Sequence, residues 1–167
     1  ESRPFPELIG VEKGFFAPGD YDNDGDVDIL LIGEDANAQK IAVVYRNDGD
    51  RFNSIQAGLQ GVRRGRVAWG DYDNDGDSDI LLIGEADSGP VAKIYRNDLT
   101  ETRQEFVDIQ ADLPGIESGE IAWVDYDNDG DSDIFFAGRN EDGKPIAKLF
   151  RNDGGDFFES EFGITAV

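Results

Sequence analysis

The chain contains one sequence unit written three times, and this internal repeat restricts the possible folds more than any other feature. The segment DYDNDGDVD at residues 20–28 returns as DYDNDGDSD at residues 71–79 and again at residues 125–133. The apolar segments on both sides of it recur in the same phase. Repetition with a period of about 50 residues indicates an array of similar supersecondary units.

Each unit is predicted to form four short strands and no helix, because its apolar runs are short and lack a 3.6-residue period. The first strand leads into the acidic segment. The second is the continuous apolar run that follows, which suits a strand buried on both faces. The third ends in Arg-Asn-Asp, and the fourth begins at a phenylalanine. The first strands are expected at residues 14–20, 66–71 and 120–125, and the fourth strands at Phe52, Phe106 and Phe157.

Four antiparallel strands in about 50 residues are typical of one blade of a β-propeller. We therefore expect an all-β fold in which residues 1–167 form a single repeat domain. Its three blades are expected at about residues 14–61, 62–115 and 116–167. A β-solenoid is the alternative, although its repeats are usually much shorter.

Three blades cannot encircle an axis, because propellers usually have four to eight blades. Two apolar blade faces would then be bare, which favours self-association. The smallest closed solution is a head-to-tail homodimer with six blades, and a trimer with nine blades is the next. The alternative is that the chain is a designed protein or an excised piece of a longer propeller, without a native ligand.

Composition excludes several classes of protein. With no Cys and no His, the chain has no disulfides, no Cys-based zinc site and no Ser-His-Asp triad. A formal net charge of −22 argues against nucleic acid and anionic lipid as partners. The apolar runs are too short to span a bilayer, so membrane insertion is not expected, and no signal peptide is recognisable. A hydrophobic fraction of 38% is nevertheless enough for a packed core.

The acidic segment has the pattern of a metal-binding loop. It places Asp at positions 1, 3, 5, 7 and 9 and Gly at position 6, where the glycine permits a sharp bend. Hard oxygen ligands in this number suit Ca²⁺ better than Mg²⁺, and softer metals would require His or Cys. We therefore predict three Ca²⁺ per chain. The candidate metal ligands are Asp20, Asp22, Asp24, Asp26 and Asp28, then Asp71, Asp73, Asp75, Asp77 and Asp79, then Asp125, Asp127, Asp129, Asp131 and Asp133.

A solvated acidic turn is the alternative for these segments, since Asp, Asn and Gly are common in turns. Two carboxylates about 4 Å apart repel by about 4 kcal/mol at an effective dielectric constant near 20. Five carboxylates packed together in each of three loops would therefore oppose folding without a cation. An EF-hand is excluded because position 12 is Leu31, Leu82 or Phe136 in place of the required Glu.

The motif D-x-D-x-D-G-x-x-D followed by an apolar strand resembles the FG-GAP/VCBS-type repeat. This is the calcium-binding blade of integrin α-subunit propellers and of many bacterial surface proteins, and the resemblance covers all three units. It implies that the side chains at positions 1, 3, 5 and 9 and the carbonyl at position 7 bind one Ca²⁺ in the hairpin between the first two strands. The Phe-Gly pair that names the family is only partly kept, as Gly-Phe-Phe at residues 14–16.

Two further sets of residues recur in phase. Trp69 and Trp123 each precede an acidic loop, and strand alternation places them on the same face as Val67 and Ile121. Packing between blades is favoured for them over a sugar-stacking platform. For Arg46, Arg96 and Arg151 we favour a structural ion pair with a nearby carboxylate over an active-site role.

Three functions compete at this point. We favour a calcium-stabilised scaffold for binding or adhesion, with a protein or glycan as a possible ligand. Such a scaffold is expected outside the cell or at the cell surface, as in secreted bacterial proteins. A lectin-like propeller is the alternative, although the loops at residues 33–40, 84–90 and 138–145, taken as the connections between blades, are small and charged. An enzyme is disfavoured because nearly every clustered carboxylate is assigned to metal.

Overall fold

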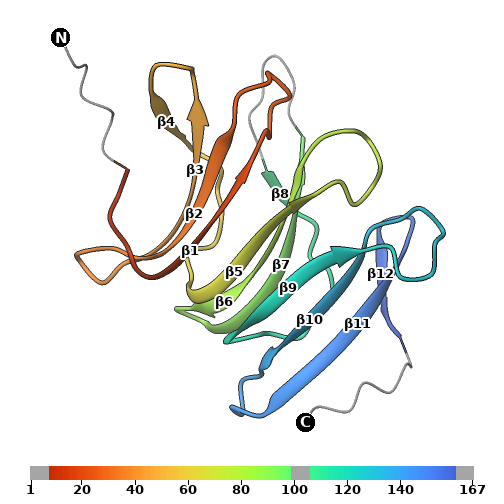
Figure 1. The fold of residues 1–167 in the computed structure, drawn as a ribbon. Helices are drawn as coiled ribbons and strands as arrows, with labels where there is room; N and C mark the ends of the chain where they lie inside the picture. The colour runs from red at the N-terminus through yellow and green to blue at the C-terminus, as the bar shows by residue number, and fades with distance from the viewer. Residues whose placement is uncertain (1–7, 99–105, 161–167) are drawn as a thin grey trace.

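The computed structural model describes residues 8–98 and 106–160, which form three four-stranded antiparallel sheets without any helix (Figure 1). We call these sheets blades 1, 2 and 3. Blade 1 contains β1 (Glu12–Gly19), β2 (Asp28–Glu34), β3 (Lys40–Asn47) and β4 (Phe52–Ile55). Blade 2 contains β5 (Arg63–Gly70), β6 (Asp79–Ala86), β7 (Gly89–Asn97) and β8 (Phe106–Asp108). Blade 3 contains β9 (Ser118–Val124), β10 (Asp133–Arg139), β11 (Pro145–Asp153) and β12 (Asp156–Glu159).

The strands of each blade are hydrogen-bonded in sequence order, so each sheet is a simple meander. This confirms the predicted all-β fold and the four strands per unit. Among the described residues, no helix has the length and hydrophobicity that crossing a membrane would require. The predicted starts of the fourth strands, at a phenylalanine, are correct to within one residue.

The expectation for the hairpin loops was wrong. Residues 33–40, 84–90 and 138–145 were expected to connect blades, but each of these segments joins the second and third strands of a single blade. The blades are instead connected through the segments that follow β4 and β8. A meander requires this arrangement, because successive strands within a sheet pair through short hairpins.

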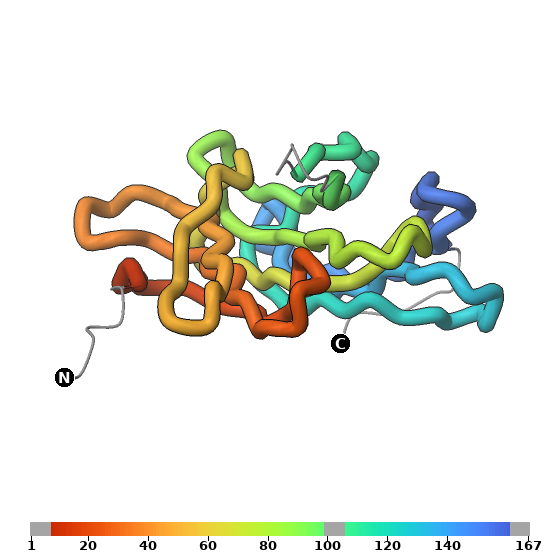
Figure 2. Tube along the Cα trace, turned by 90° about the horizontal axis from the view of Figure 1, so that it is seen from above, coloured from red at the N-terminus to blue at the C-terminus, as the bar shows by residue number. Residues whose placement is uncertain are grey.

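The three blades pack face to face in sequence order, with blade 2 in the middle (Figures 1 and 2). Their first strands, β1, β5 and β9, lie side by side. Each junction between blades has its own apolar core. In the first, Leu30 and Ile32 of blade 1 join Ile80 and Leu82 of blade 2. In the second, Leu81 and Ile83 of blade 2 join Ile134 and Phe136 of blade 3.

The second strand of each blade was predicted to be buried on both faces, and this is correct only for blade 2. The residues of β6 from Ile80 to Ile83 are all fully buried. In β2 and β10, fully buried residues alternate with half-buried ones. The outer blades have a neighbour on one face only, so their other face has no blade against it within the described residues.

Candidate metal centre

The three acidic loops connect the first and second strands of their blades and lie along the same edge of the array (Figure 1). Two residues per loop take left-handed backbone angles. The position-6 glycines have φ of 93°, 94° and 97°, a region that residues with a Cβ rarely adopt. The position-4 asparagines have φ of 57°, 57° and 61°, which Asn tolerates better than most residues. These two reversals fold the loop into a tight turn.

The aspartates at positions 1 and 5 brace the turn through backbone N–H groups. In the first loop, Asp20 accepts hydrogen bonds from the N–H groups of Asp24 at 3.1 Å and Gly25 at 3.0 Å. Asp24 accepts one from the N–H of Asp26 at 2.8 Å. The second loop repeats these bonds with nearly the same lengths. The carboxylates therefore determine the loop conformation as well as its charge.

The aspartate at position 9 is the buried anchor of each loop. Asp79 is fully buried and accepts hydrogen bonds from the backbone N–H of Tyr72 at 3.0 Å and of Asn97 at 2.8 Å. Asp28 and Asp133 are equally buried and make the equivalent bonds. Each anchor thereby joins the start of its loop to the end of the third strand of the same blade.

Three of the five carboxylates converge in every loop, those at positions 1, 3 and 9. One oxygen from each of the three lies within 4.8 Å of the others. The converging sets are Asp20, Asp22 and Asp28, then Asp71, Asp73 and Asp79, then Asp125, Asp127 and Asp133. The same arrangement therefore occurs once in each blade.

The aspartates at positions 5 and 7, although predicted as ligands, lie outside these converging sets. In the second and third loops, the side chain at position 7 contacts the preceding acidic loop. Asp77 accepts a hydrogen bond from the Asn23 amide at 2.9 Å, and Asp131 accepts one from the Asn74 amide at 2.9 Å. These contacts link consecutive acidic loops into a row.

The converging carboxylates are electrostatically costly as a group. The pKa of Asp79 is raised to about 7, chiefly by burial and also by the nearby carboxylates of Asp73 and Asp75, although two backbone hydrogen bonds oppose the rise. Burial and the neighbouring aspartates likewise raise the pKa values of Asp22 and Asp28. One buried oxygen of Asp22 has no hydrogen-bond partner among the described residues.

These residues fit a calcium ion. Oxygen ligands of Ca²⁺ lie about 2.3–2.6 Å from the ion, so two ligands of one ion are at most about 5 Å apart. Carboxylate oxygens that lie within 4.8 Å of one another satisfy this limit. A divalent cation would also offset the burial and the mutual repulsion that raise the pKa values, and would give the Asp22 oxygen a partner.

The comparison with protein families agrees with the motif. Residues 20–82, which include the first two acidic loops, match the family model of the FG-GAP-like repeat. Residues 20–82 contain an FG-GAP-like repeat. A search of curated proteins found no match to the chain. FG-GAP repeats are in general non-catalytic binding modules.

The asparagines that recur directly after Arg46, Arg96 and Arg151 were not predicted to have a functional role. Asn97 is 1% exposed, and its amide donates to the carbonyl of Tyr21 across the junction at 2.8 Å and to that of Ser78 in its own blade at 3.1 Å. Asn152 makes the equivalent bonds at the second junction. Their recurrence at the same position of each repeat, within Arg-Asn-Asp, was the sequence feature that could have indicated this role.

Both tryptophans pack between blades, as predicted. Trp69 lies against Gly19 of blade 1, and its indole N–H donates to the carbonyl of Ala17 at 3.1 Å. Its ring also contacts Tyr21 and Phe106. At the second junction, Trp123 makes the equivalent ring contacts with Tyr72 and Phe157.

The repeated arginines form ion pairs, as favoured from the sequence. Each guanidinium binds the aspartate two residues later, at 2.8, 2.7 and 2.9 Å. The pairs are Arg46 with Asp48, Arg96 with Asp98, and Arg151 with Asp153.

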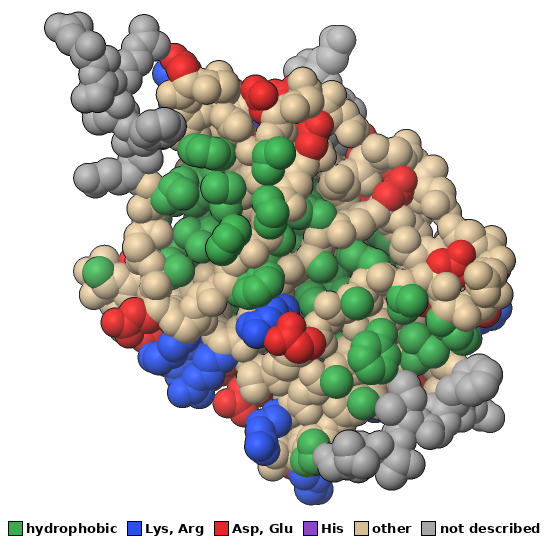
Figure 3. All heavy atoms as spheres, viewed as in Figure 1, with side chains coloured by type: hydrophobic (Ala, Val, Ile, Leu, Met, Phe, Trp, Pro, Cys, Tyr) green, Lys and Arg blue, Asp and Glu red, His purple; other side chains and the backbone are tan. Residues whose placement is uncertain are grey.

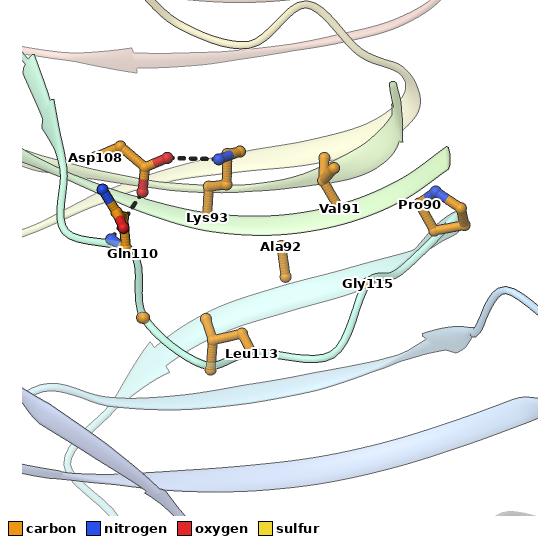
Figure 4. A pocket seen from close by; sticks show the side chains of 9 residues that line it. Pro90, Val91, Ala92, Lys93, Asp108, Gln110, Leu113 and Gly115 are labelled. Atoms are coloured by element: carbon orange, nitrogen blue, oxygen red, sulfur yellow. Dashed lines mark hydrogen bonds and ion pairs between the residues drawn. The ribbon is translucent and has the colours of Figure 1, made fainter. Parts of the chain in front are cut away.

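Away from the loops, Figure 4 shows a pocket of about 320 Å³ between β7 and the segment at residues 110–115. Its charged residues, Lys93 and Asp108, are paired with each other at 2.5 Å. Ala92 and Leu113 supply apolar lining. The ion pair occupies both charged groups, so this pocket offers no free acid–base pair.

Proposed function

We propose that the chain is a calcium-binding β-propeller module that serves as a non-catalytic binding scaffold, with one Ca²⁺ in each blade. The observation that carries this proposal is the convergence of three carboxylates within 4.8 Å in all three blades. A solvated turn has no reason to bring the same three acids together three times, since their mutual repulsion opposes it.

The residues that would hold each ion are the aspartates at positions 1, 3 and 9. The side chain at position 5 and the carbonyl at position 7 are further ligands that the resemblance implies. The ion would supply positive charge where the fold gathers buried carboxylates. The protein contributes the tight turn, the buried anchor at position 9 and the braces between neighbouring loops.

The scaffold role is a role in adhesion or ligand binding, outside the cell or at its surface. Calcium sites of extracellular modules are tuned to about 10⁻⁴–10⁻³ M, a range in which loops of this kind can act as permanent structural sites. The net charge of −22 would also keep such a scaffold soluble and repel nucleic acid and anionic lipid.

Closure into a ring is part of the proposal. Among the residues that the structure describes, blades 1 and 3 each have an uncovered face. Two copies would together supply the six blades of a closed propeller, whereas three copies would supply nine. Burial of the uncovered faces would favour either assembly over the single chain.

A lectin-like role is the second candidate, and one pocket favours it. A pocket of about 580 Å³ lies between blades 2 and 3 and is lined by Tyr72, Phe157 and Phe158, with Arg96 and Asp112 as polar groups. Aromatic faces beside a few polar groups suit a sugar. A glycan array in the presence of Ca²⁺ separates this role from a scaffold with a protein ligand.

Melting with and without calcium tests the proposal. Occupancy at a hundredfold the dissociation constant adds about 2.7 kcal/mol per site, so three sites add about 8 kcal/mol. We expect EDTA to lower the melting temperature steeply and Mg²⁺ to restore it only weakly. Asp73→Asn should lose about a third of the calcium effect, whereas Asp112→Asn, at an exposed aspartate outside the loops, should keep it. Equal melting in EDTA and Ca²⁺ would contradict the proposal.

A further inference from the structure

The outer faces of blades 1 and 3 are apolar surfaces that residues 8–98 and 106–160 leave uncovered. In blade 1, Ile29 and Leu31 are half-buried, although the residues between them and after them are fully buried. In blade 3, Phe135 and Ala137 are half-buried in the same way. Figure 3 shows hydrophobic side chains gathered over blade 1 on the side turned to the viewer. In blade 2, the equivalents of all four residues, Ile80 to Ile83, are fully buried.

We propose that these two faces dock on each other in a second copy of the chain, blade 3 of one copy against blade 1 of the next. The inference rests on the propeller packing of the proposed function and identifies the residues that make the contact. The two junctions inside the chain show what a contact between blades requires, so the outer faces can be compared with them position by position.

The first requirement concerns size beside the acidic loop. Trp69 packs on Gly19, where an added Cβ would lie 2.5 Å from the indole Cδ1. Trp123 packs on Gly70, where the corresponding distance is 2.4 Å. The indole therefore needs a glycine opposite it at both internal junctions.

The outer faces change both members of this pair. Blade 3 has Val124 at the position of the glycine, and blade 1 has Pro18 at the position of the tryptophan. A tryptophan-bearing strand would collide with Val124, whereas the smaller Pro18 leaves room for it. The larger residue on one face is therefore matched by the smaller residue on the other.

The second comparison concerns charge at the far end of the strands, where the two internal junctions differ. At the second junction the matching residues are both acidic, Glu85 and Glu117, and the Arg64 guanidinium lies 3.3 and 3.4 Å from their carboxylates. At the first junction, Glu34 of blade 1 accepts a hydrogen bond from the Arg63 guanidinium of blade 2 at 2.6 Å. This ion pair is largely buried, because the Glu34 side chain is 13% exposed and the Arg63 side chain is 25% exposed. The paired charges lower the pKa of Glu34.

The outer faces carry the same pair with the charges exchanged. Arg139 lies six residues after the anchor Asp133, as Glu34 lies six residues after Asp28. Glu12 lies eight residues before its acidic loop, as Arg63 does before the next loop. Arg139 and Glu12 are both exposed. Opposite charges at these two positions favour contact between the two outer faces, as they do at the first junction.

The third requirement is an asparagine that reaches the preceding acidic loop. Asn97 and Asn152 donate across the internal junctions to the backbone of that loop and are almost completely buried. Asn47 holds the same position in blade 1 but is only half-buried, and its amide donates to Val27 of its own blade at 3.1 Å. In the proposed contact, Asn47 would reach the third acidic loop of the second copy. The second copy thus contributes a residue to a metal loop.

With two copies the contact forms twice and is related by a two-fold axis, so every outer face is covered. Size, charge and hydrogen bonding each favour blade 1 of this chain as the occupant of the face on blade 3. A blade of another sequence would have to combine a small residue, an acid and an asparagine at the same three positions.

Mass in solution with charge-exchange variants tests the contact. In saturating Ca²⁺, light scattering should give a mass near twice 18.3 kDa. Arg139→Glu and Glu12→Arg should each weaken the dimer about tenfold or more, since two junctions lose their pair, and the double variant should restore it. Lys144→Glu, the matched control in the hairpin beside Arg139, should have no effect.

Crosslinking tests the direction of the contact. The chain has no Cys, so introduced thiols are the only ones. A mixture of Glu12→Cys and Arg139→Cys chains should crosslink through a short bismaleimide, whereas neither variant should crosslink with itself. Self-crosslinking of either variant, or an equal effect of Lys144→Glu, would overturn the proposal.

Circular dichroism and calcium stoichiometry of each variant separate docking from the proposed function. A folded monomer with three bound Ca²⁺ would overturn the docking and leave the calcium function intact. A dimer without bound calcium would support the docking and overturn the calcium function. A mass of three copies, or docking only on a different protein, would overturn the two-copy ring.

Discussion

Removal of the Asn97 amide should destabilise the protein strongly, because this side chain joins blades 1 and 2 at the level of the acidic loops. The amide donates to Tyr21 at 2.8 Å and to Ser78 at 3.1 Å, and the side chain is 1% exposed. Asn97→Ala keeps the backbone N–H that binds Asp79, so it removes only the amide.

The magnitude follows from two buried carbonyls that lose their donor. A hydrogen bond contributes about 0.5–1.5 kcal/mol, and a buried group left without a partner costs about 1–3 kcal/mol. We expect Asn97→Ala to lower the free energy of unfolding by about 2–4 kcal/mol, which is about 4–16 °C in melting temperature for a chain of this size.

Urea unfolding in saturating Ca²⁺ measures this change, and the fluorescence of Trp69 and Trp123 reports on both junctions. Asn37→Ala is the matched control, because Asn37 is exposed in the β2–β3 hairpin and should change the free energy of unfolding by less than about 0.5 kcal/mol. A loss below 1 kcal/mol for Asn97→Ala, or equal losses for both variants, would refute the role assigned to this amide.

Three more results are expected. Gly70→Val should cost about 2 kcal/mol or more in urea unfolding, because its side chain would overlap the Trp123 indole, 2.4 Å from the added Cβ. Because the pKa of Asp79 is raised to about 7, this carboxyl stabilises the metal-free fold at low pH. The stabilisation is fully present below the pKa that Asp79 has in the unfolded chain, and it is lost as the pH rises through 7. Calcium-free protein should therefore melt higher at pH 5 than at pH 8, and saturating Ca²⁺ should reverse this order in calorimetry. Arg63→Met should raise the lowered pKa of Glu34, which NMR titration of that carboxyl measures, whereas Lys13 should keep part of the lowering.

Much of the fold could be predicted because the sequence repeats. Three copies in one phase determined the number of strands, and the aspartate spacing located the loops between the first two strands of each blade. The in-phase Trp69 and Trp123 could be assigned to blade packing, because a residue that recurs in each unit usually serves the contact between units.

The rest depended on information that the pattern of one unit does not contain. Whether β6 or β2 is buried on both faces depends on how many neighbours a blade has. The hairpin at residues 33–40 resembles a connection between blades until the strand order is known. The hydrogen bond between the Asp77 side chain and Asn23 of the neighbouring loop likewise depends on how the blades pack. The sequence pattern of a single unit does not determine which residues contact the next unit.

Calcium stoichiometry tests the central claim most directly. Protein dialysed against calcium buffer and then analysed for metal should contain three Ca²⁺ per chain, and Asp22→Asn, Asp73→Asn and Asp127→Asn should each remove one. Asp112→Asn should retain all three. One ion or none in the unmodified chain would contradict the account, because the three loops gather the same carboxylates in the same way.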